Sequence, residues 1–431
     1  MKTLNAKDKS FFTELKILLQ KRYQQNISNI DNVVKKIILD VAKRGDKALI
    51  EYTMKFDGTK INEKNILLSQ EQRISYKDRI DSKTMNAFKV SISNVTKFHK
   101  KQKPKNYKLS KNGVKSSMLW KPIKSVGLYI PGGSSAYPSS VIMNVIPAKV
   151  AGVERIVVTT PSNFGEINPY VLALLDELNI GEIYQVGGAQ AIASLAYGTD
   201  SIQQVNKIFG PGNAYVASAK KQVFGKVGID LIAGPSEIVV VADKDNNPKW
   251  VAADLIAQAE HDELAQSILI TDDKNFAKKV IDEIPELTSQ LSKKSIIKKS
   301  LNRFGMVIIA DNFKNTEEII DFIAPEHLHL QNKSRYKMMK NINNAGGIFI
   351  GDYTSEAFGD YIVGTNHVLP TSGSAKFSSG LGVLDFMKRT SVVEMNSTGY
   401  RLNQSNVSKM AEIENLDGHK LSVKIRQTDK K

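Results

Sequence analysis

Two kinds of hydrophobic pattern divide the chain. From about residue 10 to 110, apolar residues recur three to four positions apart, as in 31–39, and this spacing predicts helices. From residue 125 onward, short β-branched runs alternate with longer helical segments. In this first series we expect strands at 125–130, 155–160, 182–186 and 207–209, separated and followed by helices at 139–150, 169–178, 189–197 and 214–223. Such alternation predicts a parallel sheet with helices on both faces.

A second series of the same kind begins near Glu237. Asn247-Pro248 has the pattern of an N-cap followed by proline at the first helical position, and we expect that helix to run to about residue 266. Residues 382–431 return to helical patterning. We expect strands at 238–242, 267–271, 306–310, 327–331 and 347–351.

These patterns predict an α/β fold with two Rossmann-like domains, each an incomplete, doubly wound parallel sheet, and with helical N-terminal and C-terminal extensions. Four segments follow from this interpretation. They are an N-terminal helical extension (1–25), a first α/β domain (26–125 plus 237–381), a second α/β domain (126–236), and a C-terminal helical tail (382–431).

The charge of the chain is concentrated in its first part. The formal net charge is +16, and residues 1–125 contain 29 Lys/Arg against 11 Asp/Glu, whereas the rest is nearly balanced. A basic segment of this kind is typical either of a nucleic-acid-binding surface or of a solvated, lysine-coated helical surface. No basic stripe interleaved with aromatic residues supports the first interpretation, so we expect no nucleic-acid partner.

The chain contains no cysteine, which excludes disulfides, thiolate metal sites and a cysteine nucleophile. The first residues lack the apolar core of a signal peptide, and no apolar run approaches the length of a membrane span. We therefore expect a cytoplasmic protein without a membrane partner.

Three glycine-rich turns follow expected strands, at 129–134 (YIPGGS), 186–190 (VGGAQ) and 209–213 (FGPGN). Glycine lets backbone N–H groups approach a pyrophosphate, and dinucleotides bind at the carboxyl ends of parallel strands. Each turn alone is also compatible with an ordinary tight connection between strand and helix. Three of them at one sheet edge favour a ligand crevice.

Histidines and carboxylates of the second series are candidates for chemistry. His261 shares a face of a mostly apolar helix with Gln258, and the adjacent Glu326 and His327 offer two proton-transfer groups with different pKa values. His329 is interpreted as a packing or surface residue. His261, Asp360 and His419, with an amide oxygen, would suit a zinc-like ion, although their separation in the sequence matches no zinc motif.

Taken together, seven motifs make the chain similar to the histidinol dehydrogenase family over roughly residues 30–420. They occur in the order YIPGG (129–133), VGGAQA (186–191), FGPGN (209–213), AGPSE (233–237), QAEH (258–261), PEHL (325–328) and GTNHVLP (364–370). The resemblance implies an NAD-dependent oxidoreductase acting on CH–OH groups, which converts L-histidinol to L-histidine through L-histidinal with two NAD. These are the last steps of histidine biosynthesis.

The resemblance also implies roles for the four segments and for individual residues. The first α/β domain would be catalytic and metal-binding, the second would bind NAD, and the C-terminal tail (382–431) would mediate dimerisation. Glu326 and His327 would be the catalytic acid/base pair. The family is a homodimer with sites shared between subunits, so that His419 would act across the interface. Metal ligands to one Zn²⁺ per subunit would be Gln258, His261, Asp360 and His419; NAD contacts would be Tyr129, Gln190 and Asn213; and substrate contacts would be Ser236, Gln258, His261, His327, Asp360, His367, Glu414 and His419.

Two other classes of protein remain open at this point. A zinc-dependent hydrolase with Glu326 as its base would need no nicotinamide cofactor, and it would leave the three glycine-rich turns unexplained. A nucleic-acid-binding protein would show steeply salt-dependent binding and would leave the histidines unexplained.

Overall fold

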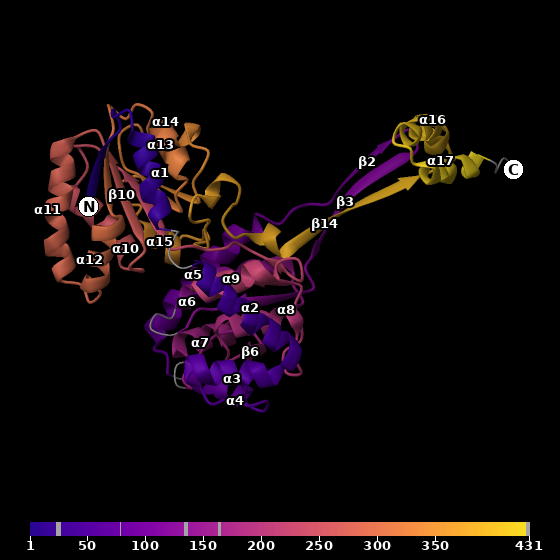
Figure 1. Ribbon diagram of the computed structural model, residues 1–431, viewed down its shortest axis with the longest axis horizontal. Coiled ribbons are helices and arrows are strands. Elements are labelled where there is room, and N and C mark those ends of the chain that lie inside the picture. Colours follow the sequence, from indigo (N-terminus) through magenta and orange to yellow (C-terminus); the bar gives the residue numbers. More distant parts are fainter. Residues whose placement is uncertain (23–26, 78, 133–136, 163–164, 428–431) are drawn as a thin grey trace. The chain divides into compact units, whose positions relative to one another are not determined.

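The structure of the protein is a computed structural model that describes residues 1–22, 27–77, 79–132, 137–162 and 165–427. These residues form two compact units, which can be followed along the chain in Figure 1. The first unit comprises Met1–Gln102 and Ile123–Phe386, and the second comprises Lys103–Pro122 and Met387–Lys431. Gly133 and Ser134 of the first glycine-rich turn lie outside the described residues.

The second α/β series of the sequence forms a six-stranded parallel sheet in the first unit. The strand that opens this series, β9 (Glu237–Val241), lies centrally, and the later strands are added on both sides of it, as in doubly wound folds. The strands lie in the order β1 (Lys2–Asn5), β11 (Met306–Ile309), β10 (Gln266–Thr271), β9 (Glu237–Val241), β12 (His327–Leu330) and β13 (Gly347–Ile350).

Alternate residues of this sheet enter two separate cores. Val239 and Val241 pack in one core with helices α1, α13 and α14, and Ile238 and Val240 pack in the other with α10 and α11. Because both faces are covered, the central strands are apolar without interruption. The helices around this sheet are α1 (Phe11–Lys21), α10 (Pro248–Ala259), α11 (Lys274–Ser289), α12 (Lys294–Phe304), α13 (Thr316–Ile323), α14 (Arg335–Asn341) and α15 (Glu356–Tyr361).

The first α/β series forms a five-stranded parallel sheet in the same unit. Its first strand, β4, again lies centrally, so the topological switch point falls between β4 and β7. The strands lie in the order β6 (Glu182–Tyr184), β5 (Arg155–Thr159), β4 (Ser125–Tyr129), β7 (Lys207–Phe209) and β8 (Gly228–Ile229). The two parallel sheets confirm the predicted fold class.

Helices from two parts of the sequence surround the five-stranded sheet. One face packs against α2, α3, α8 and α9 in a single apolar core. Right-handed crossovers place α6 and α7 on the opposite face, and α6 contacts α5 while α7 contacts α4. The helices are α2 (Ile27–Arg44), α3 (Asp46–Asp57), α4 (Gln70–Lys77), α5 (Ser82–Lys100), α6 (Pro138–Ala151), α7 (Pro169–Glu177), α8 (Gly188–Tyr197) and α9 (Ala214–Val223).

The distribution of the segments differs from our sequence-based division. Residues 26–125 were grouped with 237–381, but α2 and α3 contribute to the core of the five-stranded sheet. Residues 1–25 are not only helical, because β1 pairs with β11 and buries Leu4. Four residues are too few for an alternating pattern to stand out, and amphipathic helices do not reveal which sheet they will cover.

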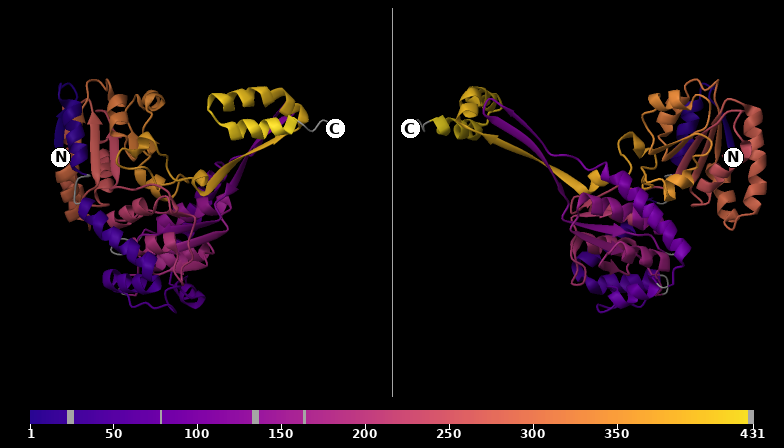
Figure 2. Two further views of the ribbon diagram at one scale, coloured as in Figure 1. Left: turned by 45° about the vertical axis from the view of Figure 1, so that its right-hand side comes forward. Right: turned by 180° about the vertical axis from the view of Figure 1, so that it is seen from behind.

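The second unit contains a three-stranded antiparallel sheet and two helices. Its strands β2 (Tyr107–Lys111), β3 (Val114–Pro122) and β14 (Met387–Met395) were not predicted, because lysines and serines dilute their apolar alternation. Figure 2 shows the two helices lying side by side at the C-terminal end, coloured yellow. They are α16 (Ser397–Ile413) and α17 (Asp417–Lys424), so residues 382–431 are helical only in part.

Short 3-10 segments complete the assignment at Ser374–Lys376, Val383–Phe386 and Ile425–Gln427. Within the described ranges, none of the helices combines the length and the apolar composition needed to cross a membrane.

The helix starts follow from side chains that the sequence provides. Asn247 accepts hydrogen bonds from the backbone N–H groups of Lys249 and Trp250, with Pro248 in the first turn, as the pattern predicts. Asn168 and Asn213 cap α7 and α9 in the same way. The helix that begins at Pro248 ends at Ala259, several residues before the expected end, because 260–265 form the turn into β10.

A buried ion pair fixes the turn that follows β7. Lys220 and Asp230 form the pair, and both side chains are almost fully buried. Lys220 Nζ also donates to the carbonyls of Gly210 and Leu231, at 2.8 Å each, and Asp230 Oδ2 accepts from Gly210 N at 2.8 Å. A Cβ on Gly210 would lie 2.1 Å from the carbonyl oxygen of Tyr129, so the turn packs directly against the end of β4 and requires glycine.

Removing one partner of this pair should destabilise the first unit strongly. We expect Lys220→Met to lower the free energy of unfolding by about 3–5 kcal/mol, because it leaves the Asp230 carboxylate buried and unpaired. The double variant Lys220→Met/Asp230→Leu should recover much of this loss. Urea unfolding measures the effect, and Lys299→Met, which breaks the exposed pair with Glu263, serves as the control with a change below about 1 kcal/mol. If Lys220→Met and Lys299→Met lowered the free energy of unfolding by the same amount, the prediction would be contradicted.

Candidate active site

Two glutamates begin adjacent central strands of the six-stranded sheet at its amino-terminal edge. Pro325 follows the end of α13, so the chain turns there and enters β12 at Glu326 and His327. Residue 327 pairs with residue 238 of β9, which brings Glu326 beside Glu237. Glu326 Oε2 accepts a hydrogen bond from Glu237 N at 2.9 Å. The expected position of Glu326 and His327 at the start of a strand is thus what the structure has.

Arg22, directly after α1, lies among the groups that precede and begin β9. Its Nη1 lies 2.5 Å from Glu237 Oε1, and its side chain is fully buried. The remaining donors reach three backbone carbonyls, those of Leu264 at 2.6 Å, Ser236 at 2.8 Å and Pro235. Glu237 Oε1 also accepts from Ser372 N at 3.0 Å. The guanidinium therefore compensates the Glu237 carboxylate and joins the loops that precede β9 and β10.

Burial raises the pKa of Glu326 well above its usual value. The hydrogen bond from Glu237 N opposes this effect, the charges of Glu237 and Asp360 add to it, and the charge of Arg22 lowers the pKa. A buried carboxyl group with a raised pKa can both accept and return a proton near neutral pH.

His327 has one ring nitrogen engaged and the other free for chemistry. Its Nδ1 lies 3.0 Å from the carbonyl oxygen of Glu237, and because a carbonyl can only accept, Nδ1 carries the proton. Nε2 therefore carries the lone pair, and it has no hydrogen-bond partner among the described residues. Burial lowers the pKa of His327 to about 3, so the ring is neutral at physiological pH. The geometry therefore leaves Nε2 as the acceptor atom of a neutral imidazole.

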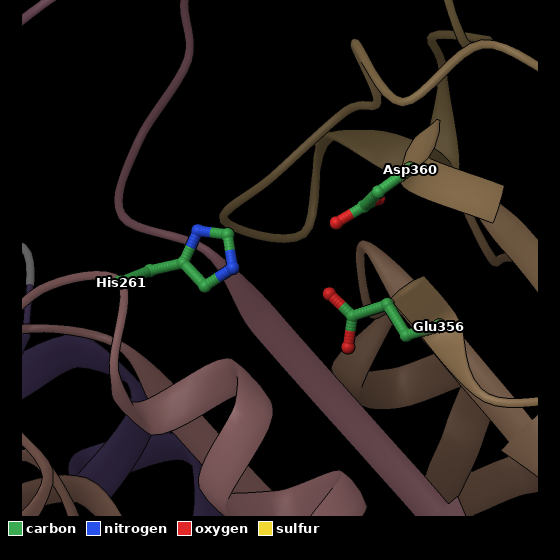
Figure 3. A group of neighbouring side chains, drawn as sticks. All are labelled: His261, Glu356 and Asp360. Atoms are coloured by element: carbon green, nitrogen blue, oxygen red, sulfur yellow. The ribbon is translucent and has the colours of Figure 1, made fainter. Parts of the chain in front are cut away.

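Three side chains next to His327 form a group with the spacing of metal ligands. One ligand atom each from His261, Glu356 and Asp360 lies within 4.8 Å of the others, and Figure 3 shows the carboxylates facing the imidazole. Glu356 and Asp360 come from the same face of α15, four residues apart, and His261 follows the end of α10. Asp360 Oδ1 lies 3.9 Å from His327 Nε2.

Gln258 connects this group to the proton-transfer pair. With its amide nitrogen oriented toward the surrounding acceptors, Gln258 donates to the carbonyl oxygen of Glu237 at 2.9 Å and to Glu356 Oε1 at 3.2 Å. Glu356 Oε1 also lies 3.3 Å from His327 Nδ1. The predicted ligands Gln258, His261 and Asp360 thus lie in one region, where Glu356 joins them.

The chemistry of this group fits a divalent cation. Burial raises the pKa of Glu356 and of Asp360, and Glu356 Oε2 is buried without a hydrogen-bond partner among the described residues. Carboxylates buried this closely are unfavourable unless a positive charge compensates them. Imidazole nitrogen with carboxylate oxygens is a donor set that zinc and related ions accept.

His367 and Ser236, two predicted substrate contacts, also lie at this edge. His367 Nε2 lies 3.1 Å from Ser139 Oγ of α6, and burial lowers the pKa of His367 to about 4, with a further contribution from His261. Ser236 immediately precedes β9 and its carbonyl oxygen accepts from Arg22. Glu414 and His419 belong to the second unit, and both are exposed there.

His329 has a structural environment, in agreement with its interpretation as a packing residue. The ring is fully buried, its Nε2 lies 2.9 Å from the carbonyl oxygen of Gly351, and its Nδ1 lies 3.1 Å from Gln331 Nε2 and 3.2 Å from Asp254. Every ring nitrogen is therefore engaged, in contrast to His327.

The three predicted NAD contacts lie at the carboxyl edge of the five-stranded sheet. Tyr129 ends β4 and its hydroxyl accepts from Gly188 N at 3.3 Å. Gln190 is buried in the first turn of α8, and its Nε2 has no hydrogen-bond partner among the described residues. Asn213 caps α9 through Oδ1, which leaves its amide nitrogen available at an exposed position. This edge contains the switch point, where doubly wound sheets bind their ligands.

Sequence reasoning missed three residues of the site. Glu237 was noted only as part of the AGPSE motif, and Glu356 could have been found from its i,i+4 spacing to Asp360. Arg22 follows an amphipathic helix and carries no sequence signal of its own.

Two parallel sheets, a neutral buried imidazole beside a carboxyl group and a nearby group of potential metal ligands are the features of an α/β protein with a candidate active site. A family model for histidinol dehydrogenase matches residues 20–427. The chain belongs to this family, and it is accordingly a dehydrogenase.

Individual relatives match over nearly the whole chain. Histidinol dehydrogenase of Rhodospirillum rubrum is 46% identical over 405 residues, covering 94% of this chain and 93% of that protein. The enzyme of Clostridium acetobutylicum is 46% identical over 410 residues, with 95% of both chains covered. The crystal structure of histidinol dehydrogenase from Elizabethkingia anophelis superposes with a TM-score of 0.94 at 36% identity, covering 99% of this chain and 98% of that chain.

The two histidines of β12 should respond differently to the same substitution. In His327→Asn the side-chain amide can still donate to the carbonyl of Glu237, so we expect the thermal midpoint to stay within about 2 °C while kcat falls at least about 100-fold. His329→Asn cannot reach Gly351 and should lower stability by about 1–3 kcal/mol with kcat largely retained in the folded protein. Thermal unfolding and steady-state kinetics measure both effects. Full activity of His327→Asn would refute the assignment of Nε2 as the base.

Proposed function

We propose that this chain oxidises L-histidinol to L-histidine through L-histidinal with two NAD and zinc, as the last steps of histidine biosynthesis. One observation carries the proposal: the neutral His327, with Nε2 free for chemistry, lies next to the buried Glu326 and the group of potential metal ligands. Membership of the family supplies the substrate class. A cytoplasmic location follows from this role and remains a prediction.

His327 would act in the first oxidation. Its Nε2 accepts the proton of the substrate hydroxyl as the C–H bond of the same carbon breaks, which yields the aldehyde. Nδ1 keeps its proton and donates it to the carbonyl oxygen of Glu237, and this hydrogen bond holds the ring in the required tautomer. NAD, when bound, would accept a hydride in each of the two oxidations.

Glu326 would act in the second oxidation. Without a cysteine the chain cannot form a thiohemiacetal, so the aldehyde must add water and lose hydride from the resulting gem-diol. Glu326 removes a proton from that water, and its raised pKa matches a base that operates near neutral pH. The carboxyl group is held for this purpose by the backbone N–H of Glu237.

The metal would be bound by Gln258, His261 and Asp360 of one subunit and by His419. Zinc, when bound, would hold the imidazole and amine of the substrate, which is a template role. Ser236, His367 and Glu414 would contact the substrate around it. Keeping the aldehyde bound between the two oxidations requires such an anchor, because a released aldehyde would escape the second step.

NAD would bind at the carboxyl edge of the five-stranded sheet. Tyr129, Gln190 and Asn213 lie there, and the amide nitrogens of Gln190 and Asn213 are not engaged in described hydrogen bonds of their own. The turn at Gly210, which the Lys220–Asp230 pair fixes, and the N-terminus of α9 would supply backbone N–H groups and a favourable dipole for a pyrophosphate.

The second unit supports a homodimer in which each C-terminal segment completes the partner's site. The unit has few buried apolar side chains, so it cannot be stable on its own core. Large apolar side chains are exposed instead, and such a surface is typical of an interface. They include Leu109, Val393, Leu402, Met410, Ile413, Leu421 and Ile425.

The stoichiometry of NADH tests the proposed reaction. We expect purified, zinc-loaded protein to release about two NADH per L-histidinol consumed, measured by absorbance against substrate quantified by chromatography. Absence of NADH formation would refute the proposal.

Two controls sharpen this test. Chelation of the metal should abolish turnover, and zinc should restore it. Glu326→Gln should slow the oxidation of L-histidinal more than that of L-histidinol, because only the second step needs a base for water.

Mixing inactive variants tests the shared site. Glu326→Ala and His419→Ala homodimers should each be inactive, but a mixed dimer would contain one site with both residues intact. Random 1:1 reassembly should therefore restore up to about a quarter of the wild-type activity. Refolding each variant alone is the control. Mixed dimers confirmed by mass spectrometry but without activity would contradict a site shared between subunits.

A further inference from the structure

Asp57 has no part in the proposed reaction, yet it is held at the carboxyl edge of the five-stranded sheet. It is the last residue of α3, and Gly58 follows in the left-handed conformation with φ 63°, which turns the chain sharply. A Cβ on Gly187 would lie 3.2 Å from Asp57 Oδ2 and 2.5 Å from Pro161 Cβ. The Asp57 carboxylate therefore reaches the turns that follow β5 and β6.

The backbone around Asp57 is fixed in that place. Thr59 Oγ1 donates to the carbonyls of Asp57 and Ser162, at 3.1 Å each, and accepts from Ser162 Oγ at 2.9 Å. Thr59 and Ser162 are both buried. The end of α3 is thus attached to the loop after β5 through a site that excludes solvent.

The protein itself offers few hydrogen-bond donors to the carboxyl group of Asp57. Oδ2 is buried without a hydrogen-bond partner among the described residues, whereas part of the side chain is open to solvent. Burial raises the pKa of Asp57 to about 6, which the nearby Gly187 N–H only partly offsets. Such a group gains from donors supplied by a ligand.

The position of Asp57 corresponds to a known requirement of dinucleotide sites. In doubly wound sheets an acidic residue at the end of the strand next to the first one receives the ribose hydroxyls of NAD. Here that strand is β5, and it ends in Thr159-Thr160-Pro161 without an acid. Asp57 brings a carboxylate to the same edge from α3 instead.

We infer that Asp57 accepts hydrogen bonds from the ribose hydroxyls on the adenine side of the cofactor and thereby selects NAD over NADP. The inference rests on the proposed use of NAD. A 2′-phosphate at this position would place its negative charge against the carboxylate and would remove the 2′-hydroxyl donor. Both effects would weaken the binding of NADP. A purely structural role at the N-terminus of α8 is the competing explanation.

The test compares NAD and NADP with wild-type protein, Asp57→Asn and Asp57→Ala. We expect the KM for NAD to rise about 10- to 100-fold and the NAD:NADP ratio of kcat/KM to fall by a similar factor, with the KM for L-histidinol unchanged. Calorimetric titration with each nucleotide provides a readout that is independent of turnover. Glu51→Gln is the matched control, since Glu51 lies on the same helix, is exposed and forms an ion pair with Arg44 alone among the described residues.

The outcomes separate the two explanations. A lower thermal midpoint with an unchanged NAD:NADP ratio in Asp57→Asn and Asp57→Ala would overturn the inference and leave a structural residue. If Asp57→Ala does not fold, Asp57→Asn, which is nearly isosteric, decides the question by the nucleotide titration. Wild-type protein that binds neither nucleotide would instead refute the proposed function itself.

Discussion

The buried contact between Arg22 and Glu237 is the interaction on which the candidate active site depends. Glu237 begins β9 and supplies the site with its backbone, since its N–H binds Glu326 and its carbonyl oxygen binds His327. Its side chain is charged and inaccessible, which would be strongly unfavourable without the guanidinium. Arg22 also holds the loops that precede β9 and β10. The position of both proton-transfer groups therefore follows from one ion pair that itself takes no part in the reaction.

The two sheets of the first unit use opposite edges. The five-stranded sheet follows the general rule, with glycine-rich turns and helix N-termini at its carboxyl edge. The six-stranded sheet has the same topology, but Glu326, His327 and Glu237 lie where its strands begin. Loop residues after α15 connect the two parts, because Asn366 donates to the carbonyl of Met143 and Ser91 donates to the carbonyl of Tyr361. The proposed substrate site at the amino edge of one sheet and the proposed cofactor site at the carboxyl edge of the other are thus linked through the same segment.

The sequence predicted those elements whose signal is local. Most strands of both parallel sheets, most of their helices and the start of β12 directly after Glu326 follow from short apolar runs, caps and Pro325, whereas the short strands β1 and β8 were not predicted. The strands β3 and β14 could not be predicted, because lysines and serines interrupt their apolar positions and because the two strands pair with each other across about 270 positions of chain. Arg22 and the packing of α2 against the five-stranded sheet depend on contacts between distant segments, which no local pattern encodes. Gln258, His261 and Asp360 were predicted as ligands through the family resemblance, and their proximity to Glu356 appears only in three dimensions.

The absence of cysteine and the burial of Glu326 are linked by the chemistry. An enzyme that oxidises an aldehyde through water needs a base that is ionised often enough to act and basic enough to remove a proton from water. Burial alone would keep Glu326 protonated, whereas full exposure would make it too weak a base. The N–H of Glu237 and the charge of Arg22 lower its pKa, and the neighbouring carboxylates raise it. In the proposed reaction, the balance between these opposing effects would suit Glu326 to act on water without a thiolate.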